Sequence, residues 1–135
     1  MMIAKSTWVK NFQSVVDNGR THSLVVDLPP GKNGDDFGPT ALELANMALA
    51  GCISTIFAVV AGKMRLNIQT LEVTVDSLQP DDAPTITKSD ILLKIKTSDS
   101  EDKVNRCFEQ TMKMCPVGVI FSNAGIETNH RIELV

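Results

Sequence analysis

The sequence predicts an α+β fold, and its length is about that of one domain. Short extended segments come first, one long apolar helix follows, and the second half holds two strands, one or two helices and a final strand. Strands are grouped together instead of alternating one by one with helices, which favours α+β over an alternating parallel fold. With 135 residues, 43% hydrophobic and 21% charged, the chain is long enough to bury one sizeable core. We therefore expect a single domain over residues 1–135.

Three short N-terminal strands are expected to form a meander. They are residues 2–9, 12–17 and 24–28. Turns at 10–11 and 17–20 separate them, and Asn18-Gly19 in the second turn is a strong hairpin signal. The next segment, residues 29–38, holds two Pro, three Gly and a pair of Asp, which predicts a loop without regular structure.

A long helix is expected over residues 40–65. Thr40 and Glu43 have the T-x-x-E spacing of a capping box, and about 26 residues at the helical rise span roughly 39 Å. One face carries small side chains three or four residues apart, namely Ala41, Ala45, Ala48, Cys52 and Thr55. A helix that is apolar nearly all round needs more cover than one small sheet supplies, so we expect a second copy of the chain.

The uncharged run at residues 44–61 is eighteen residues long, which is the lower limit for a membrane span. It contains Asn46, Ser54 and Thr55 and lacks aromatic belts or a basic flank, so the centre of a soluble protein is favoured over a membrane. Residues 1–10 lack the features of a signal peptide, and we expect a cytoplasmic protein.

The second half predicts two strands, two helices and a last strand. The strands at 71–78 and 87–97 show clean alternation of apolar residues. Ser100 is placed to cap a helix over residues 101–114, and Cys115-Pro116 predicts a further short helix to Phe121. Residues 128–135 alternate again and predict the closing strand.

Charge and aromatic content argue against nucleic acid as a partner. The net charge is −3 with a pI near 5.3, and the chain has no Tyr, one Trp and five Phe. We expect no cofactor. A metal site built from cysteines and histidines is disfavoured because no pair has the spacing of zinc ligands. The residues weighed for it are Cys52, Cys107, Cys115, His22 and His130.

Two of the three cysteines lie in very different settings. Cys52 lies inside the long apolar helix, and Cys115 stands directly before Pro116. Once the chain folds they could face each other and form a redox pair that no local C-x-x-C motif announces. Cys107 lies on an apolar stripe and is interpreted as a small buried core residue. Structural disulfides are rare in the cytoplasm, so an odd number of cysteines points to core thiols or to chemistry.

The residues around both cysteines resemble the OsmC/Ohr family of thiol peroxidases. The stretch 38–44, GPTALEL, continuing through ALAGC at 48–52, is similar to the first cysteine motif, and CPV at 115–117 is similar to the second. The order of elements fits along essentially the whole chain. The resemblance implies an intertwined α+β homodimer with two active sites at the subunit interface.

The resemblance also implies a reaction. Cys52 would attack an organic hydroperoxide as a thiolate, Cys115 would resolve the sulfenic acid into a disulfide, and an external dithiol, on a lipoylated protein or a thioredoxin-like protein, would complete the cycle. A thiolate and a second thiol within disulfide reach are what such chemistry requires. An apolar lining would favour bulky organic peroxides, although its candidate residues are also typical of ordinary core. They are Met47, Ile56, Phe57 and Phe121.

Arg20 and Glu43 are the further candidate site residues. Family peroxidases activate the attacking thiolate with an arginine, which in the Ohr branch sits in the turn after the first strand; here that turn is Lys10-Asn11, and Arg20 lies in the second turn. Arg20 could reach the thiol from there, but its place does not match that of the family arginine, and a solvated turn residue is the more common outcome. Glu43 either completes the capping box with Thr40 or holds the activating arginine. The segment 19–30 resembles the OsmC-like branch.

The attacking sulfur and the function each have a rival interpretation. Helix-terminus reasoning favours Cys115 as the thiolate, because the amide groups after Pro116 would stabilise it, whereas the resemblance favours Cys52. We follow the resemblance, because residues at the subunit interface can supply the cation that Cys52 needs. The alternative function is a non-catalytic dimeric module that binds an apolar or thiol ligand, with sulfurs that merely pack.

Overall fold

The computed structural model describes all 135 residues, which form two compact units, Met1–Ala45 and Asn46–Val135. The single-domain organisation expected over residues 1–135 remains a prediction.

The N-terminal unit is built on a three-stranded antiparallel meander. Its strands are β1 (Lys5–Lys10), β2 (Gln13–Asp17) and β3 (Ser23–Val26), paired in the order β1-β2-β3. Gly19 adopts a φ of +70° in the second turn, a conformation that glycine reaches without steric cost. The meander predicted from the sequence is confirmed, and its first strand begins three residues later than expected.

The segment after the meander contains regular structure that the sequence did not predict. A short 3₁₀ helix, η1 (Pro30–Lys32), follows β3, whereas we expected residues 29–38 to form only a loop. Proline at its first position pre-sets φ for a helical turn, and Asn33 ends it in the left-handed conformation with a φ of +64°. The expectation of a loop without regular structure was therefore wrong for Pro30–Lys32, because proline is compatible with the start of a short helix.

Asp27 holds this segment in place. Its carboxylate accepts hydrogen bonds from the N–H groups of Leu28 (2.7 Å) and Phe37 (3.1 Å). Burial opposes its ionisation, but the backbone N–H groups of Phe37, Leu28 and Asp35 outweigh that effect, and the pKa of Asp27 is lowered. The buried carboxylate thus fixes the chain on the way to the long helix.

The C-terminal unit combines a three-stranded sheet with helices. After the long helix α1 (Ala41–Met64), which begins in the N-terminal unit, come β4 (Thr70–Leu78), β5 (Lys88–Lys96), α2 (Glu101–Met114), α3 (Pro116–Asn123) and β6 (Glu127–Leu134). β5 is the central strand, antiparallel to β4 and parallel to β6. The predicted α+β order is confirmed, and the helix and strand ends of this unit differ from the expected ones by at most two residues.

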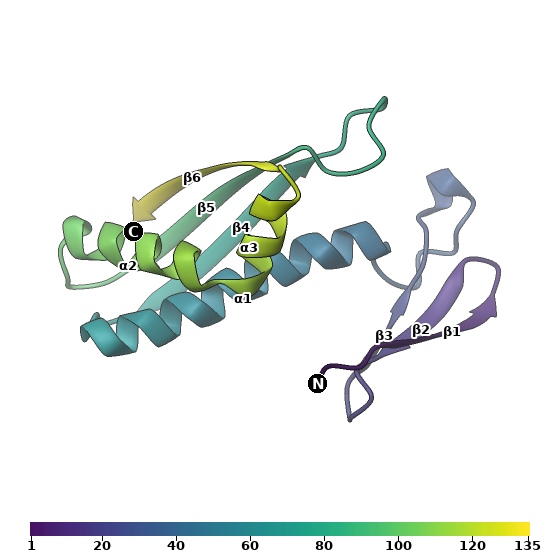
Figure 1. The fold of residues 1–135 in the computed structure, drawn as a ribbon, viewed down its shortest axis with the longest axis horizontal. Coiled ribbons are helices and arrows are strands. Elements are labelled where there is room, and N and C mark those ends of the chain that lie inside the picture. Colours follow the sequence, from purple (N-terminus) through teal and green to yellow (C-terminus); the bar gives the residue numbers. More distant parts are fainter. The chain divides into compact units, whose positions relative to one another are not determined.

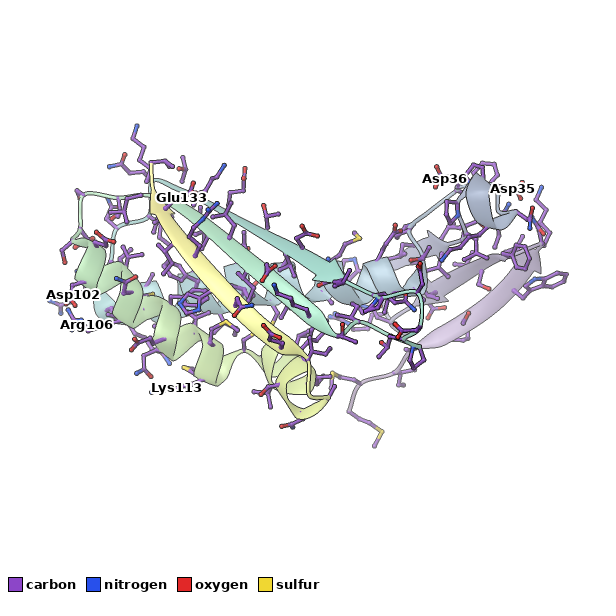
Figure 2. The ribbon with its side chains drawn as sticks, turned by 90° about the horizontal axis from the view of Figure 1, so that it is seen from above. Asp35, Asp36, Asp102, Arg106, Lys113 and Glu133 are labelled. Carbon is purple, nitrogen blue, oxygen red and sulfur yellow. The ribbon has the colours of Figure 1, made fainter.

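The core of this unit lies between the sheet and the helices. Figure 1 shows α1 and α2 running along the sheet formed by β4, β5 and β6. The sheet contributes Ile91, Leu93 and Ile95 from alternate positions of β5, all almost fully buried. The helices contribute buried side chains at helical spacing, namely Leu49, Ile53, Phe57, Val60, Val104, Cys107 and Phe108. Figure 2 shows the charged residues Asp102, Arg106 and Lys113 on the outer side of α2.

A polar network fixes α1 on the sheet. The Asn46 side-chain amide donates to the Val75 carbonyl (2.9 Å), and its oxygen accepts from the Ser77 hydroxyl (2.6 Å). Ser77 also shares a hydrogen bond of 2.7 Å with the buried Ser89. Because buried polar groups are costly unless paired, this network favours one position of the helix along the strands.

Helix α1 has the length and hydropathy of a membrane span. Its residues Leu49, Ile53, Phe57, Val60 and Ala61 are nevertheless buried within the protein. A single helix of this kind therefore carries little weight as evidence for a membrane.

A Schellman motif ends α1. The N–H of Leu66 donates to the Ala61 carbonyl (2.9 Å) and the N–H of Arg65 to the Gly62 carbonyl (3.3 Å). Lys103 then donates from Nζ to the Arg65 carbonyl (3.0 Å) and to Asp99 Oδ1 (2.8 Å), and its hydrogen bond lowers the pKa of Asp99. The end of α1 is thus tied to the start of α2.

Replacing Arg65 by glycine is expected to raise the free energy of unfolding by about 1 kcal/mol, because an L-residue in the left-handed region is strained. Arg65 has a φ of +55° there, and the hydrogen bond from Lys103 goes to its backbone carbonyl, which glycine retains. Urea unfolding of the reduced protein at fixed concentration measures the change. Gly125→Ala, at a φ of +75°, serves as the opposite control and should lower stability by a similar amount. An unchanged or lowered stability of Arg65→Gly would contradict the assignment.

Candidate functional site

The two cysteines singled out from the sequence meet in the C-terminal unit. Cys52 lies in the middle of α1 and Cys115 lies between α2 and α3, 63 positions further along the chain. Their sulfur atoms are 2.8 Å apart, with the Cys115 thiol donating a hydrogen bond to Cys52 Sγ. Both are free thiols. The expected convergence of residues 52 and 115 in one place is therefore present in the fold.

Cys115 is fixed by the ends of two helices at once. Its backbone N–H donates to the Thr111 carbonyl (2.8 Å) and so completes α2, and its sulfur accepts from the Gly118 N–H (3.3 Å) and so caps α3. Pro116 at the first position of α3 has no N–H to satisfy, and it disfavours a helical conformation at Cys115. The Cys-Pro pair thus creates a break at which the thiol points inward.

Burial separates the two thiols. Cys115 is completely buried, whereas Cys52 keeps partial exposure to solvent. Burial raises the pKa of Cys115, the hydrogen bond to Cys52 raises it further, and the Gly118 N–H lowers it, with a net pKa of about 11. The amide stabilisation that sequence reasoning expected for Cys115 is present, but burial outweighs it. The accessible sulfur is Cys52.

Cys107 is a core residue. It is fully buried, and its thiol faces the Phe57 carbonyl at 3.7 Å. Burial raises its pKa. The core interpretation made from the apolar stripe fits this environment.

Glu43 and Arg20 belong to the N-terminal unit. Glu43 forms both bonds of the capping box: its carboxylate accepts from the Thr40 N–H (2.8 Å), and its own N–H donates to Thr40 Oγ1 (3.1 Å). Arg20 is an exposed residue of the turn between β2 and β3, where its backbone N–H donates to Asn18 Oδ1 (3.1 Å). Glu43 is thus a capping-box residue and Arg20 an exposed turn residue. A role of either residue at the sulfurs remains a prediction.

The apolar candidates fall into two groups. Phe57 and Phe121 are buried core residues, whereas Met47 is 56% exposed and Ile56 is partly exposed. The exposed group lies on α1, as Cys52 does. Sequence reasoning did not single out Gly118, whose N–H contacts Cys115 Sγ; an N-cap residue followed three positions later by a small residue is a weak signal for it.

A pocket of about 570 Å³ lies in the C-terminal unit. Its walls come from α2, α3 and β6, and include Phe108, Met112, Gly118 and His130. The rings of Phe108 and His130 lie 4.5 Å apart between centroids. Gly118, whose N–H contacts Cys115 Sγ, is part of this lining, but neither Cys115 nor Cys52 is. The structure contains no group of three or more His, Cys, Asp or Glu side chains placed to hold a metal ion.

Solved structures with the same fold are found over the full length of the chain. An OsmC-like protein from Mycoplasma pneumoniae has a TM-score of 0.89 at 14% identity, covering 100% of this chain and 97% of that chain. An organic hydroperoxide resistance protein from Elizabethkingia anophelis, with thiocyanate bound, has a TM-score of 0.77 at 15% identity, covering 100% and 96%. An organic hydroperoxide resistance protein, OsmC, from Legionella pneumophila has a TM-score of 0.72 at 12% identity, covering 99% and 96%. At such identities the likeness concerns the fold.

The sequence itself places the chain in a family. A comparison with curated proteins gives no match. The family model for OsmC-like proteins matches residues 31–131, which include α1, both cysteines and most of β6. Because this match extends over well more than half of the sequence and agrees with the fold, the protein belongs to the OsmC/Ohr family.

Proposed function

We propose that this protein is a thiol-dependent peroxidase that reduces organic hydroperoxides in oxidative stress defence. The observation that carries the proposal is the 2.8 Å approach of Cys52 Sγ and Cys115 Sγ, one accessible and one buried. A thiolate that reduces a peroxide becomes a sulfenic acid, and a second thiol at this range can trap it as a disulfide before further oxidation. Family membership and the names of two structural neighbours support the same class of reaction.

The cycle has three steps. The Cys52 thiolate takes the terminal oxygen of the hydroperoxide, the O–O bond breaks, and a sulfenic acid and an alcohol form. Cys115 then attacks Cys52 Sγ, and the sulfenic oxygen leaves as hydroxide or water when the disulfide forms. A dithiol, carried by a lipoylated or thioredoxin-like protein, reduces the disulfide by exchange and is itself oxidised. Assigning the attack to Cys52 follows from its exposure, since a peroxide must reach the sulfur.

A homodimer is part of the proposal, with its active sites at the interface. One stripe of α1 carries small exposed residues at alternating three- and four-residue spacing: Ala48, Gly51, Thr55, Ala58 and Gly62. Met47 and Val59, beside this stripe, are exposed apolar side chains. A second copy packed along α1 would cover them and place apolar groups near Cys52.

Arg20 is proposed as the cation that favours the Cys52 thiolate, with Glu43 orienting it. A mid-helix thiol gains nothing from the helix dipole, so it requires a nearby positive charge. Arg20 is exposed in its turn, and in this proposal its guanidinium reaches Cys52 from the same chain or from a second copy. We propose a cytoplasmic location, where dithiol reductants are available.

An assay of peroxide consumption tests the function. Cumene hydroperoxide should be consumed about tenfold faster than hydrogen peroxide, because burying two CH₂-sized groups of the substrate contributes about 1.6 kcal/mol. Dihydrolipoamide and thioredoxin are compared as electron donors, and the Cys107→Ser variant is the matched control. If neither donor supports consumption of either peroxide, the result contradicts the peroxidase function and favours the alternative, a non-catalytic module for an apolar or thiol ligand.

A further inference from the structure

The hydrogen bonds around the two sulfurs form a directed chain. The Gly118 N–H donates to Cys115 Sγ (3.3 Å), and the Cys115 thiol donates to Cys52 Sγ (2.8 Å). Cys115 is completely buried, so its proton has no contact with solvent water. The thiol proton is therefore held directly beside the sulfur that reacts.

Reduction of an alkyl hydroperoxide requires a proton for the leaving oxygen while the thiolate attacks. When Cys52 attacks the terminal oxygen, the other oxygen leaves as an alkoxide, which is a poor leaving group unless it is protonated. The leaving oxygen is separated from Cys52 Sγ by a single oxygen atom, and the Cys115 thiol is the side chain hydrogen-bonded to that sulfur. We propose, building on the peroxidase function proposed above, that Cys115 is the general acid that protonates the departing alkoxide before it acts as the resolving thiol.

The atoms and charges balance. The Cys52 thiolate, the hydroperoxide and the Cys115 thiol give the Cys52 sulfenic acid, the alcohol and the Cys115 thiolate. The Cys115 thiolate then attacks Cys52 Sγ and expels hydroxide, which leaves the disulfide. The two sulfurs together lose one electron pair, the peroxide gains it, and one negative charge is carried throughout.

The surroundings of Cys115 suit both roles in this order. Before the reaction, burial and the hydrogen bond to Cys52 raise the pKa of Cys115 to about 11, so the proton stays in place at neutral pH. After the proton leaves, the N–H groups of Gly118 and Val117 at the start of α3 stabilise the new thiolate. The helix terminus therefore acts on a nucleophile that exists only once a sulfenic acid is present to receive it.

Leaving-group dependence distinguishes a proton donor from a residue that only packs. The rate of single-turnover oxidation of Cys52 is measured by rapid quenching with a maleimide. The two oxidants are cumene hydroperoxide and a peroxy acid, and the carboxylate of the peroxy acid leaves without protonation. Cys115→Ala should slow the reaction with cumene hydroperoxide about 10²-fold, within the usual range for general acid catalysis, and slow the peroxy acid by less than about threefold. Cys115→Ser, which keeps a hydroxyl donor of similar size, should recover about tenfold of the loss. Cys107→Ala should react as the unmodified protein does.

Equal slowing with both peroxides would overturn the proton transfer and leave only a role in positioning Cys52. An unchanged rate in Cys115→Ala would overturn it as well, and in both cases peroxide reduction by Cys52 would stand. If the unmodified protein oxidises with neither peroxide, the peroxidase function itself fails together with the proton transfer. Thermal unfolding of each variant checks that the comparison is made between folded proteins.

Discussion

A Cys52→Ser variant is expected to lose organic hydroperoxide reduction by at least about 10³-fold, because removal of a catalytic nucleophile typically costs this much or more. The hydroxyl of serine is a far weaker nucleophile than a thiolate at neutral pH, and the buried Cys115 cannot replace Cys52. Peroxide consumption with a dithiol donor measures the loss. Cys107→Ser is the control, since Cys107 packs against Phe57 away from the sulfur pair.

A sulfenic acid probe locates the attacking sulfur in the same experiment. The label should appear on Cys52 in Cys115→Ser, where the sulfenic acid is no longer resolved, and should be absent from Cys52→Ser. Label on Cys115 alone in both the unmodified protein and Cys52→Ser would reverse the assignment of the two roles.

Replacing Phe57 by alanine is expected to lower the free energy of unfolding by about 3–5 kcal/mol, the usual range for removal of a buried aromatic ring. Phe57 is completely buried on the face of α1 that packs in the core, and it is among the largest fully buried side chains. A loss of this size is a large fraction of a typical domain's stability. Urea unfolding of the reduced protein at fixed concentration measures it.

Leu78→Ala is the matched control for Phe57→Ala, because Leu78 is a large apolar residue that is 55% exposed at the end of β4. Its replacement should change stability by no more than about 0.5 kcal/mol. Equal losses in both variants would mean that the core does not lie where the structure places it.

The order of elements could be predicted from the sequence because its signals are local. The capping box of Thr40 and Glu43, the N-cap Ser100 and the Cys115-Pro116 break each act within a few residues. The 3₁₀ helix η1 was missed because Pro and Gly mark turns of several kinds, and composition does not distinguish a bend from a short helix.

The properties of the sulfur pair required the fold. The resemblance brought Cys52 and Cys115 together, but nothing local to Cys115 reveals that burial raises its pKa more than the Gly118 N–H lowers it. Reasoning from the helix terminus included the stabilising Gly118 N–H but not the cost of burying the Cys115 thiolate. The network of Asn46, Ser77 and Ser89 was equally out of reach, because it joins one helix to two strands.

The long span of chain between the two sulfurs has a consequence for how firmly the protein holds together. A bond between Cys52 and Cys115 ties positions separated by 63 steps in sequence. A link of that reach removes conformational freedom from the unfolded chain worth about 4 kcal/mol. Each catalytic cycle would therefore alternate between a disulfide form of higher conformational stability and a dithiol form of lower stability. The dithiol form is the one that reacts with a peroxide, so reducing conditions would favour the form that unfolds more easily.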